Sequence, residues 1–136
     1  MQLFVRIRNY AMFKKNDISA YLRTKPFTKD HDSDFVISIS SYPARISLVP
    51  AVFESLGKQV AFPKRYLLVL TEDEWPKRKV PNSIDKLVSL GLEIIWVKGN
   101  SFAVKNIAPI VEQFPDVGVV ILDDDIIYGK YVISDL

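Results

Sequence analysis

The chain has 136 residues, of which 49% are hydrophobic and 25% are charged, and its formal net charge is +2. A chain of this length can bury a single core without disulfides or a structural metal. Because it has no cysteine and a single histidine, a disulfide framework, an iron–sulfur cluster, a thiolate zinc site and a multi-histidine metal site are excluded, and any metal needs mainly oxygen ligands.

The sequence predicts a basic N-terminal extension and linker over residues 1–34 and an α/β domain over residues 35–136. Residues 1–29 carry seven basic side chains and one acidic one, whereas residues 30–136 carry eleven basic and fifteen acidic ones. Aromatic residues lie among the basic ones, so we expect a helix that either packs its aromatics on the domain or rests on anionic lipid or on RNA. No apolar run is long enough to span a bilayer, and a pI near 8.8 is too mild to indicate a nucleic-acid partner. We therefore expect a cytoplasmic protein, with peripheral contact to the inner membrane face.

From residue 35 onward, strand and helix patterns alternate. Short runs of β-branched and aliphatic residues predict strands over 35–40, 65–70, 92–97 and 117–122. Apolar residues at helical spacing, with capping or stop signals at the ends, predict helices over 47–59, 82–90 and 102–114. Nearly continuous apolar strands that alternate with helices are typical of a parallel sheet covered on both sides. The predicted fold class is therefore α/β, with a Rossmann-like, mostly parallel sheet flanked by helices.

Three consecutive aspartates, Asp123, Asp124 and Asp125, follow the last predicted strand, which is apolar on both faces. We expect this strand to be fully buried, so the carboxylates would repel one another unless a positive group lies nearby. In an extended chain, Asp123 and Asp125 point to one side and Asp124 to the other. Two such carboxylates predict a site for Mg²⁺ or Mn²⁺, which would in turn hold a diphosphate. The alternative is a solvated acidic turn.

Other protein classes also place acids after an apolar strand, but the order of the motifs disfavours them. A P-loop requires a glycine five residues before its Gly-Lys-Ser/Thr, whereas Gly57 is preceded at that distance by Val52 and Lys58 is followed by Gln59. Receiver domains and haloacid-dehalogenase-type phosphatases carry their acids after the first strand. The phosphatase alternative predicts activity on an aryl phosphate that disappears in Asp123→Asn.

Further motifs lie before and around the acids, in collinear order over about residues 35–128. They are a strand with an S-Y-P-x-R turn at 36–45, Ser55-Leu56, Gln59, Pro63, the segments 105–109 and 114–116, and D-D-D-I-I-Y at 123–128. Together these motifs resemble those of the nucleotide-diphospho-sugar glycosyltransferases of the GT-A fold, in a bacterial glycosyltransferase-like group. The resemblance implies a hexosyltransferase-like enzyme that binds a nucleotide-diphosphate sugar through a D-x-D motif and a divalent metal. Such an enzyme transfers the sugar to an acceptor hydroxyl.

The resemblance also implies roles for individual residues. Asp125 would ligate Mn²⁺ or Mg²⁺ directly, and Asp123 would contact the metal through water, or the ribose. The residues implied in nucleotide-sugar binding are Ser40, Ser41 and Tyr42 at the base and ribose, Glu72 at the border of that pocket, Arg45 and Lys105 at the phosphates, and Asp123 and Asp124.

Three of these residues could have a purely structural role instead. Arg45 could instead pair with an acid such as Glu72 or Asp124. Tyr42, directly before a proline, could be a packed turn aromatic, and Lys105 could be a solubilising residue on an exposed helix face.

The chain departs from the family pattern after the acids, where Gly129 and Tyr131 stand in place of the usual proline and tryptophan. The family's acceptor half, with its general-base carboxylate, is expected to be missing from these residues, so the GT-A-type sheet has an incomplete C-terminal half. The second hypothesis is therefore a truncated, non-catalytic nucleotide-sugar-binding or assembly module. In that case a partner chain, such as a second copy in a homodimer, would cover the unfinished sheet.

Overall fold

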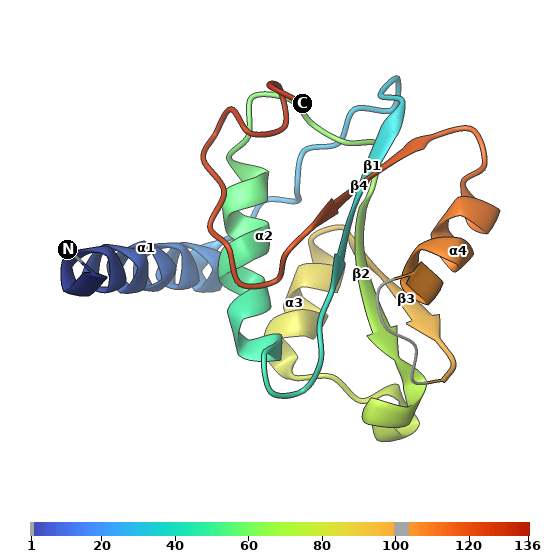
Figure 1. Cartoon of the computed structure of the whole chain (residues 1–136), viewed down its shortest axis with the longest axis horizontal. Helices are drawn as coiled ribbons and strands as arrows, with labels where there is room; N and C mark the ends of the chain where they lie inside the picture. Colours follow the sequence, from blue (N-terminus) through green and yellow to red (C-terminus); the bar gives the residue numbers. More distant parts are fainter. Residues whose placement is uncertain (1, 100–103) are drawn as a thin grey trace.

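A computed structural model describes the backbone of residues 2–99 and 104–136, and the side chains of residues 6, 8–99 and 107–136. Its helices and strands follow one another as the sequence analysis predicts (Figure 1). They are α1 (Gln2–Leu22), β1 (Phe35–Ser40), α2 (Val49–Gly57), β2 (Tyr66–Thr71), α3 (Asn82–Ser89), β3 (Leu92–Val97), α4 (Val104–Gln113) and β4 (Gly118–Leu122), with short 3-10 turns η1 (Ile46–Leu48), η2 (Glu72–Glu74) and η3 (Pro76–Arg78).

The predicted element boundaries are close to the observed ones. The strands at 35–40 and 92–97 are confirmed to the residue, the strand predicted at 65–70 is shifted by one residue at both ends, and the strand predicted at 117–122 begins one residue later. The helix predicted over 47–59 is shorter and begins as the 3-10 turn η1, because Pro50 has no N–H to donate and belongs in a first helical turn. The start predicted for the last helix, at 102–103, lies outside the described residues.

The four strands form one parallel sheet in the order β3-β2-β1-β4, which confirms the Rossmann-like α/β class. The chain first builds outward from β1 to β2 and β3, and then returns to add β4 on the other side of β1. This reversal is the topological switch point. In parallel α/β sheets, ligands bind beyond the carboxyl ends of the strands at such a point.

Two apolar cores cover the two faces of the sheet. The larger core joins the sheet to α2 and α3, and it contains the fully buried rings of Phe53 and Tyr66, which meet edge-on with centroids 6.4 Å apart. Burial raises the pKa of the Tyr66 hydroxyl, which stays protonated and donates a hydrogen bond of 2.9 Å to the carbonyl of Thr28. The smaller core lies under α4, where Ile110 packs against Val36. Each such apolar side chain stabilises the fold by about 1.5–3 kcal/mol.

The expectation of a fully buried last strand is wrong. Among the described residues β4 pairs with β1 alone, so it lies at the edge of the sheet, and 53% of Ile121 is exposed. Val120 and Leu122 pack against the larger core on one face of the sheet. On the opposite face α4 lies nearer β3, so it leaves the side chain of Ile121 uncovered (Figure 1). The apolar run reflects one well-packed face and one partly solvated face.

The N-terminal helix α1 packs across α2, outside the sheet (Figure 1). Ala20 and Asn16 are buried in this contact, and Arg23, just past the helix, pairs with the buried carboxylate of Glu54 at 2.6 Å. Gly57, at the end of α2, allows the segment after α1 to approach closely, because a Cβ there would lie 2.7 Å from Nη2 of Arg23 and 3.0 Å from the ring of Phe27. Within the described part of the chain, no helix is both long and apolar enough to span a bilayer.

Candidate functional site

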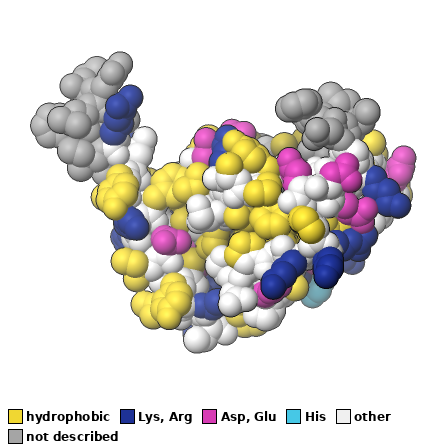
Figure 2. Space-filling model, turned by 90° about the horizontal axis from the view of Figure 1, so that it is seen from below, with side chains coloured by type: hydrophobic (Ala, Val, Ile, Leu, Met, Phe, Trp, Pro, Cys, Tyr) yellow, Lys and Arg dark blue, Asp and Glu magenta, His cyan; other side chains and the backbone are white. Residues whose placement is uncertain are grey.

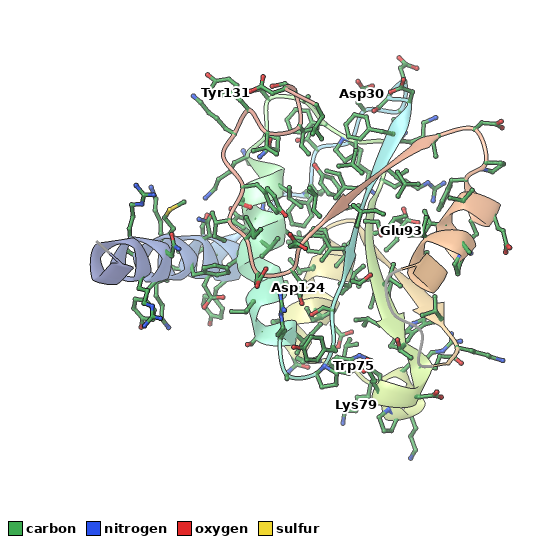
Figure 3. All side chains as sticks on the ribbon, in the orientation of Figure 1. Asp30, Trp75, Lys79, Glu93, Asp124 and Tyr131 are labelled. Carbon is green, nitrogen blue, oxygen red and sulfur yellow. The ribbon has the colours of Figure 1, made fainter. Side chains whose placement is uncertain are left out.

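The candidate site lies at the switch point, where the chain leaves β1 and β4. Pro43 follows β1 and turns the chain toward α2, since the residue before a proline is held out of helical space. The strand register pairs Ile39 with Leu122, so continuing both chains by two residues places Ser41 opposite Asp124. Figure 3 shows Asp124 at this edge of the sheet. Residues 83 positions apart in the sequence therefore meet by register alone.

Asp124 is the buried member of the acidic triplet, with 5% of its surface exposed. The hydroxyl of Ser41 donates to one of its carboxylate oxygens at 2.7 Å, and Nη2 of Arg45 donates to the other. The same Nη2 lies 2.8 Å from Oδ2 of Asp125. Arg45 is therefore the positive group that the acidic triplet requires, and it pairs with Asp124 rather than with Glu72.

Arg45 connects the turn after β1 to the loop after β4. Desolvation by itself would lower the pKa of Arg45, but the charge of Asp124, the side chain of Tyr42 and the charge of Asp125 together outweigh this effect and raise it. Its guanidinium carbon also lies 5.7 Å from the ring centroid of Tyr42, which is within cation–π range. Among the described residues, the buried Nε of Arg45 has no hydrogen-bond partner. A charged group with an unused donor therefore lies beside the acids.

The exposures of the three acids alternate as the sequence predicts: Asp123 and Asp125 are exposed, whereas Asp124 is buried. The chain is not extended throughout, however, because β4 ends at Leu122 and Asp124 and Asp125 form a turn. This turn is what allows one guanidinium to reach both Asp124 and Asp125. It also leaves the outer carboxylates accessible from solvent.

Contacts from Ser55 in α2 and from Gln59, two residues past the end of α2, hold the segment that follows the acids. The backbone N–H of Asp123 donates to the hydroxyl of Tyr128 at 2.8 Å, and the N–H of Tyr128 donates to the hydroxyl of Ser55 at 3.1 Å. The buried side chain of Gln59 donates to the carbonyl of Gly129 at 2.7 Å and accepts from the N–H of Ile133 at 3.1 Å. Burial raises the pKa of the Tyr128 hydroxyl, and the neighbouring aspartates raise it further. Sequence reasoning missed these positioning roles, although two polar residues four apart on an apolar helix are a signal for them.

The residues present fit a hard divalent cation with two protein ligands. No cluster of three or more acidic or histidine side chains suited to a metal occurs among the described residues. Mg²⁺ in nucleotide sites is commonly held by one or two carboxylates, with water and phosphate oxygens completing its shell. Within the triplet, Asp123 and Asp125 are the exposed acids, and 46% of the Asp125 side chain is accessible, so these are the two carboxylates that a cation can reach from solvent.

The other predicted site residues have mixed positions. Ser40 ends β1 and is half-buried, and Tyr42 is 43% exposed, so it is not a packed turn aromatic. Glu72 follows β2 at the same edge of the sheet, but its carboxylate pairs with Arg78. Lys105 lies in the first turn of α4, and its side chain falls outside the described residues.

Two features near the acids were not predicted. Trp75 follows β2 at the carboxyl-end edge (Figure 3), and its buried Nε1–H has no hydrogen-bond partner among the described residues. A cleft also opens beside Asp125, with Met12 and Phe13 of α1 on one side and Ile126 and Ile127 on the other. Both features depend on contacts between distant parts of the chain, so no local sequence pattern predicts them.

Comparison of the chain with protein-family models, with the curated proteins and with the solved structures finds no match in any of the three.

Proposed function

We propose that the chain binds a nucleotide-diphosphate sugar through Mg²⁺ or Mn²⁺ at the carboxyl ends of β1 and β4, as the donor-binding part of a hexosyltransferase-like glycosyltransferase. The observation that carries this proposal is the ion pair of Arg45 with Asp124 and Asp125. It joins the S-Y-P-x-R turn to the acidic triplet at the switch point of a parallel sheet, where ligands of such sheets bind.

The proposal assigns separate roles to the acids. Asp123 and Asp125, which are exposed, would hold the cation, whereas Asp124, which is buried against Ser41 and Arg45, would fix the loop that carries them. The cation, when bound, would stabilise the negative charge that develops on the departing nucleoside diphosphate. Asp124 is then a positioning residue rather than a ligand.

Donors around the acids suit the rest of the nucleotide. The unpartnered Nε of Arg45 is directed to the diphosphate in this proposal, because a guanidinium recognises phosphate through several N–H groups at once. Ser40 and the exposed ring of Tyr42 would border the base and ribose, with Glu72 farther along the edge. Lys105 would supply a second positive charge to the phosphates. We place this activity in the cytoplasm, with the acceptor hydroxyl left unassigned.

A non-catalytic nucleotide-sugar-binding or assembly module is the second candidate, and one observation favours it. Arg45 already compensates the charge of Asp124 and Asp125 without a metal. If that ion pair is permanent, the acids serve to tie two loops together and need no cation. The two candidates differ in whether Mn²⁺ and a nucleotide bind at Asp125.

Isothermal calorimetry with Mn²⁺ and UDP, GDP or CMP tests the proposal. One of these nucleotides is expected to bind the native chain, and Asp125→Ala is expected to weaken that binding by at least about 100-fold, since loss of even an indirect metal partner commonly costs 10–100-fold. Asp73→Ala is the matched control, because Asp73 is an exposed acid in η2 at the same edge of the sheet. Equal affinities for the native chain and Asp125→Ala would remove the assigned role of Asp125.

A further inference from the structure

The outward face of α1 is apolar and aromatic although α1 is packed on the domain. Phe13, Asn16 and Ala20 face α2, and 3.6 residues per turn place Ile18 and Leu22 on the opposite side of the helix. Of these outward residues, Ile18 is 59% exposed and Leu22 is 67% exposed. Tyr10 and Tyr21 flank the same face at 65% and 80% exposure.

Basic side chains lie on and beside this apolar face. Lys14 and Lys15 are exposed, and the ammonium of Lys14 lies 5.7 Å from the ring centroid of Tyr10. Arg6 and Arg8 are exposed farther along the helix, and Asp17 is its single acidic residue. Figure 2 shows yellow and dark blue side chains interspersed along α1, at the left of the view. Basic groups around aliphatic and aromatic ones are typical of helices that lie in a membrane interface.

Contacts at its C-terminal end help to hold α1 in this orientation. The ammonium of Lys86 donates to the carbonyl oxygens of Ala20 and Tyr21 at the end of α1, at 3.0 Å for Ala20. The carbonyl of Ala20 also accepts from the backbone N–H of Arg23 at 3.3 Å, and a cation at a helix C-terminus interacts favourably with the last carbonyls and the helix dipole. From Tyr10 to Leu22 the outward face is therefore one surface of roughly 20 Å, since each helical residue adds 1.5 Å.

We propose that the outward face of α1, formed by Tyr10, Lys14, Lys15, Ile18, Tyr21 and Leu22, binds to the surface of an anionic lipid bilayer. A second copy of this chain fits less well, because a symmetric contact would bring the basic side chains of both copies together. A nucleic acid would use the basic groups but would leave Ile18 and Leu22 without a contact. A bilayer satisfies both kinds of side chain, since its headgroups are acidic and its acyl boundary takes the apolar ones.

Binding of α1 to a membrane would also affect the cleft beside Asp125. Met12 and Phe13 of α1 line the cleft beside Asp125, so α1 lying on a membrane would keep that cleft close to the bilayer surface. The membrane proposal does not depend on nucleotide binding, and either can fail alone.

Sedimentation of the full chain with lipid vesicles tests the proposal. The chain is expected to bind vesicles that contain phosphatidylglycerol, to bind pure phosphatidylcholine vesicles far less, and to dissociate in high salt. Lys14→Gln/Lys15→Gln is expected to weaken binding about 30-fold, or about fivefold per lysine. Lys77→Gln/Lys79→Gln is the matched control, because both lysines are exposed in the loop after β2. Ile18→Ser/Leu22→Ser is expected to weaken binding as well, and circular dichroism checks that every variant is folded.

Three results would overturn the proposal. One is a folded chain that does not bind anionic vesicles. Another is an equal loss of binding in the two lysine pairs, which would indicate unspecific attraction of a basic protein. The third is self-association or RNA binding that the α1 variants abolish while vesicle binding is unchanged.

Discussion

Replacing Arg23 with methionine is expected to destabilise the chain by about 3–5 kcal/mol, because it leaves a buried carboxylate without its main partner. Nε of Arg23 lies 2.6 Å from Oε2 of Glu54, and 4% of the Glu54 side chain is exposed. Ser19 would still donate a hydrogen bond to Glu54, but Lys58 lies 3.8 Å away and is itself largely exposed. Urea denaturation followed by circular dichroism measures the change in the free energy of unfolding.

Lys58→Met is the control for this prediction. Its ion pair with Glu54 is long and solvent-exposed on the lysine side, so the expected loss is within about 1 kcal/mol. A loss for Arg23→Met that is no larger than the control would show that this ion pair does not anchor α1 to α2.

The same pair predicts how stability depends on pH. Burial alone would raise the pKa of Glu54, but hydrogen bonds from Arg23 and Ser19 outweigh it and lower the pKa below its ordinary 4.5. The contribution of Glu54 to stability is therefore present at neutral pH and is lost as the pH falls below about 4.5 and through the lowered pKa. Glu54→Gln should flatten this part of the stability profile.

Asp124→Ala is expected to have the second largest effect, on both stability and ligand binding. It leaves the buried hydroxyl of Ser41 without its acceptor, which costs about 1–3 kcal/mol, and it releases Arg45 from one of its two acids. Because Asp124 fixes the loop that carries Asp123 and Asp125, nucleotide binding with Mn²⁺ should weaken by about 10–100-fold. Urea denaturation and calorimetry measure the two effects.

Asp124→Asn separates the positioning role from a direct one. Its amide oxygen still accepts from Ser41, so it should recover most of the lost stability and part of the lost nucleotide affinity. Affinity in Asp124→Ala that equals that of the native chain would contradict the positioning role.

The sequence predicts the strands and their succession along the chain well, for local reasons. β1 and β3 match to the residue, because β-branched runs end at clear breakers: Pro43 comes shortly after β1 and Gly99 after β3. The parallel sheet follows from the alternation of strands and helices. The burial of β4 (Gly118–Leu122) could not be predicted, because an apolar run does not distinguish an edge strand from a central strand.

The candidate site is predictable in part. The acidic triplet and the turn after β1 stand out in the sequence, and the need for a positive group beside the acids follows from electrostatics. Arg45 supplies this charge to Asp125 as well as to Asp124 because the chain turns after Leu122. No local sequence pattern predicts that turn. The hydrogen bonds of Tyr128 and Gln59, and the unpartnered Nε1–H of Trp75, arise from tertiary contacts.

The central claim is that a divalent cation joins Asp123 and Asp125 to the diphosphate of a nucleotide sugar. Crystals grown with Mn²⁺ and the nucleoside diphosphate that binds most tightly in calorimetry test it most directly. An anomalous scattering peak about 2.0–2.2 Å from oxygens of Asp125 and the diphosphate, with Asp123 reaching it directly or through one water, is the predicted result. Crystals that contain the nucleotide elsewhere, or with Arg45 still paired to Asp125 and no peak beside the acids, would contradict it.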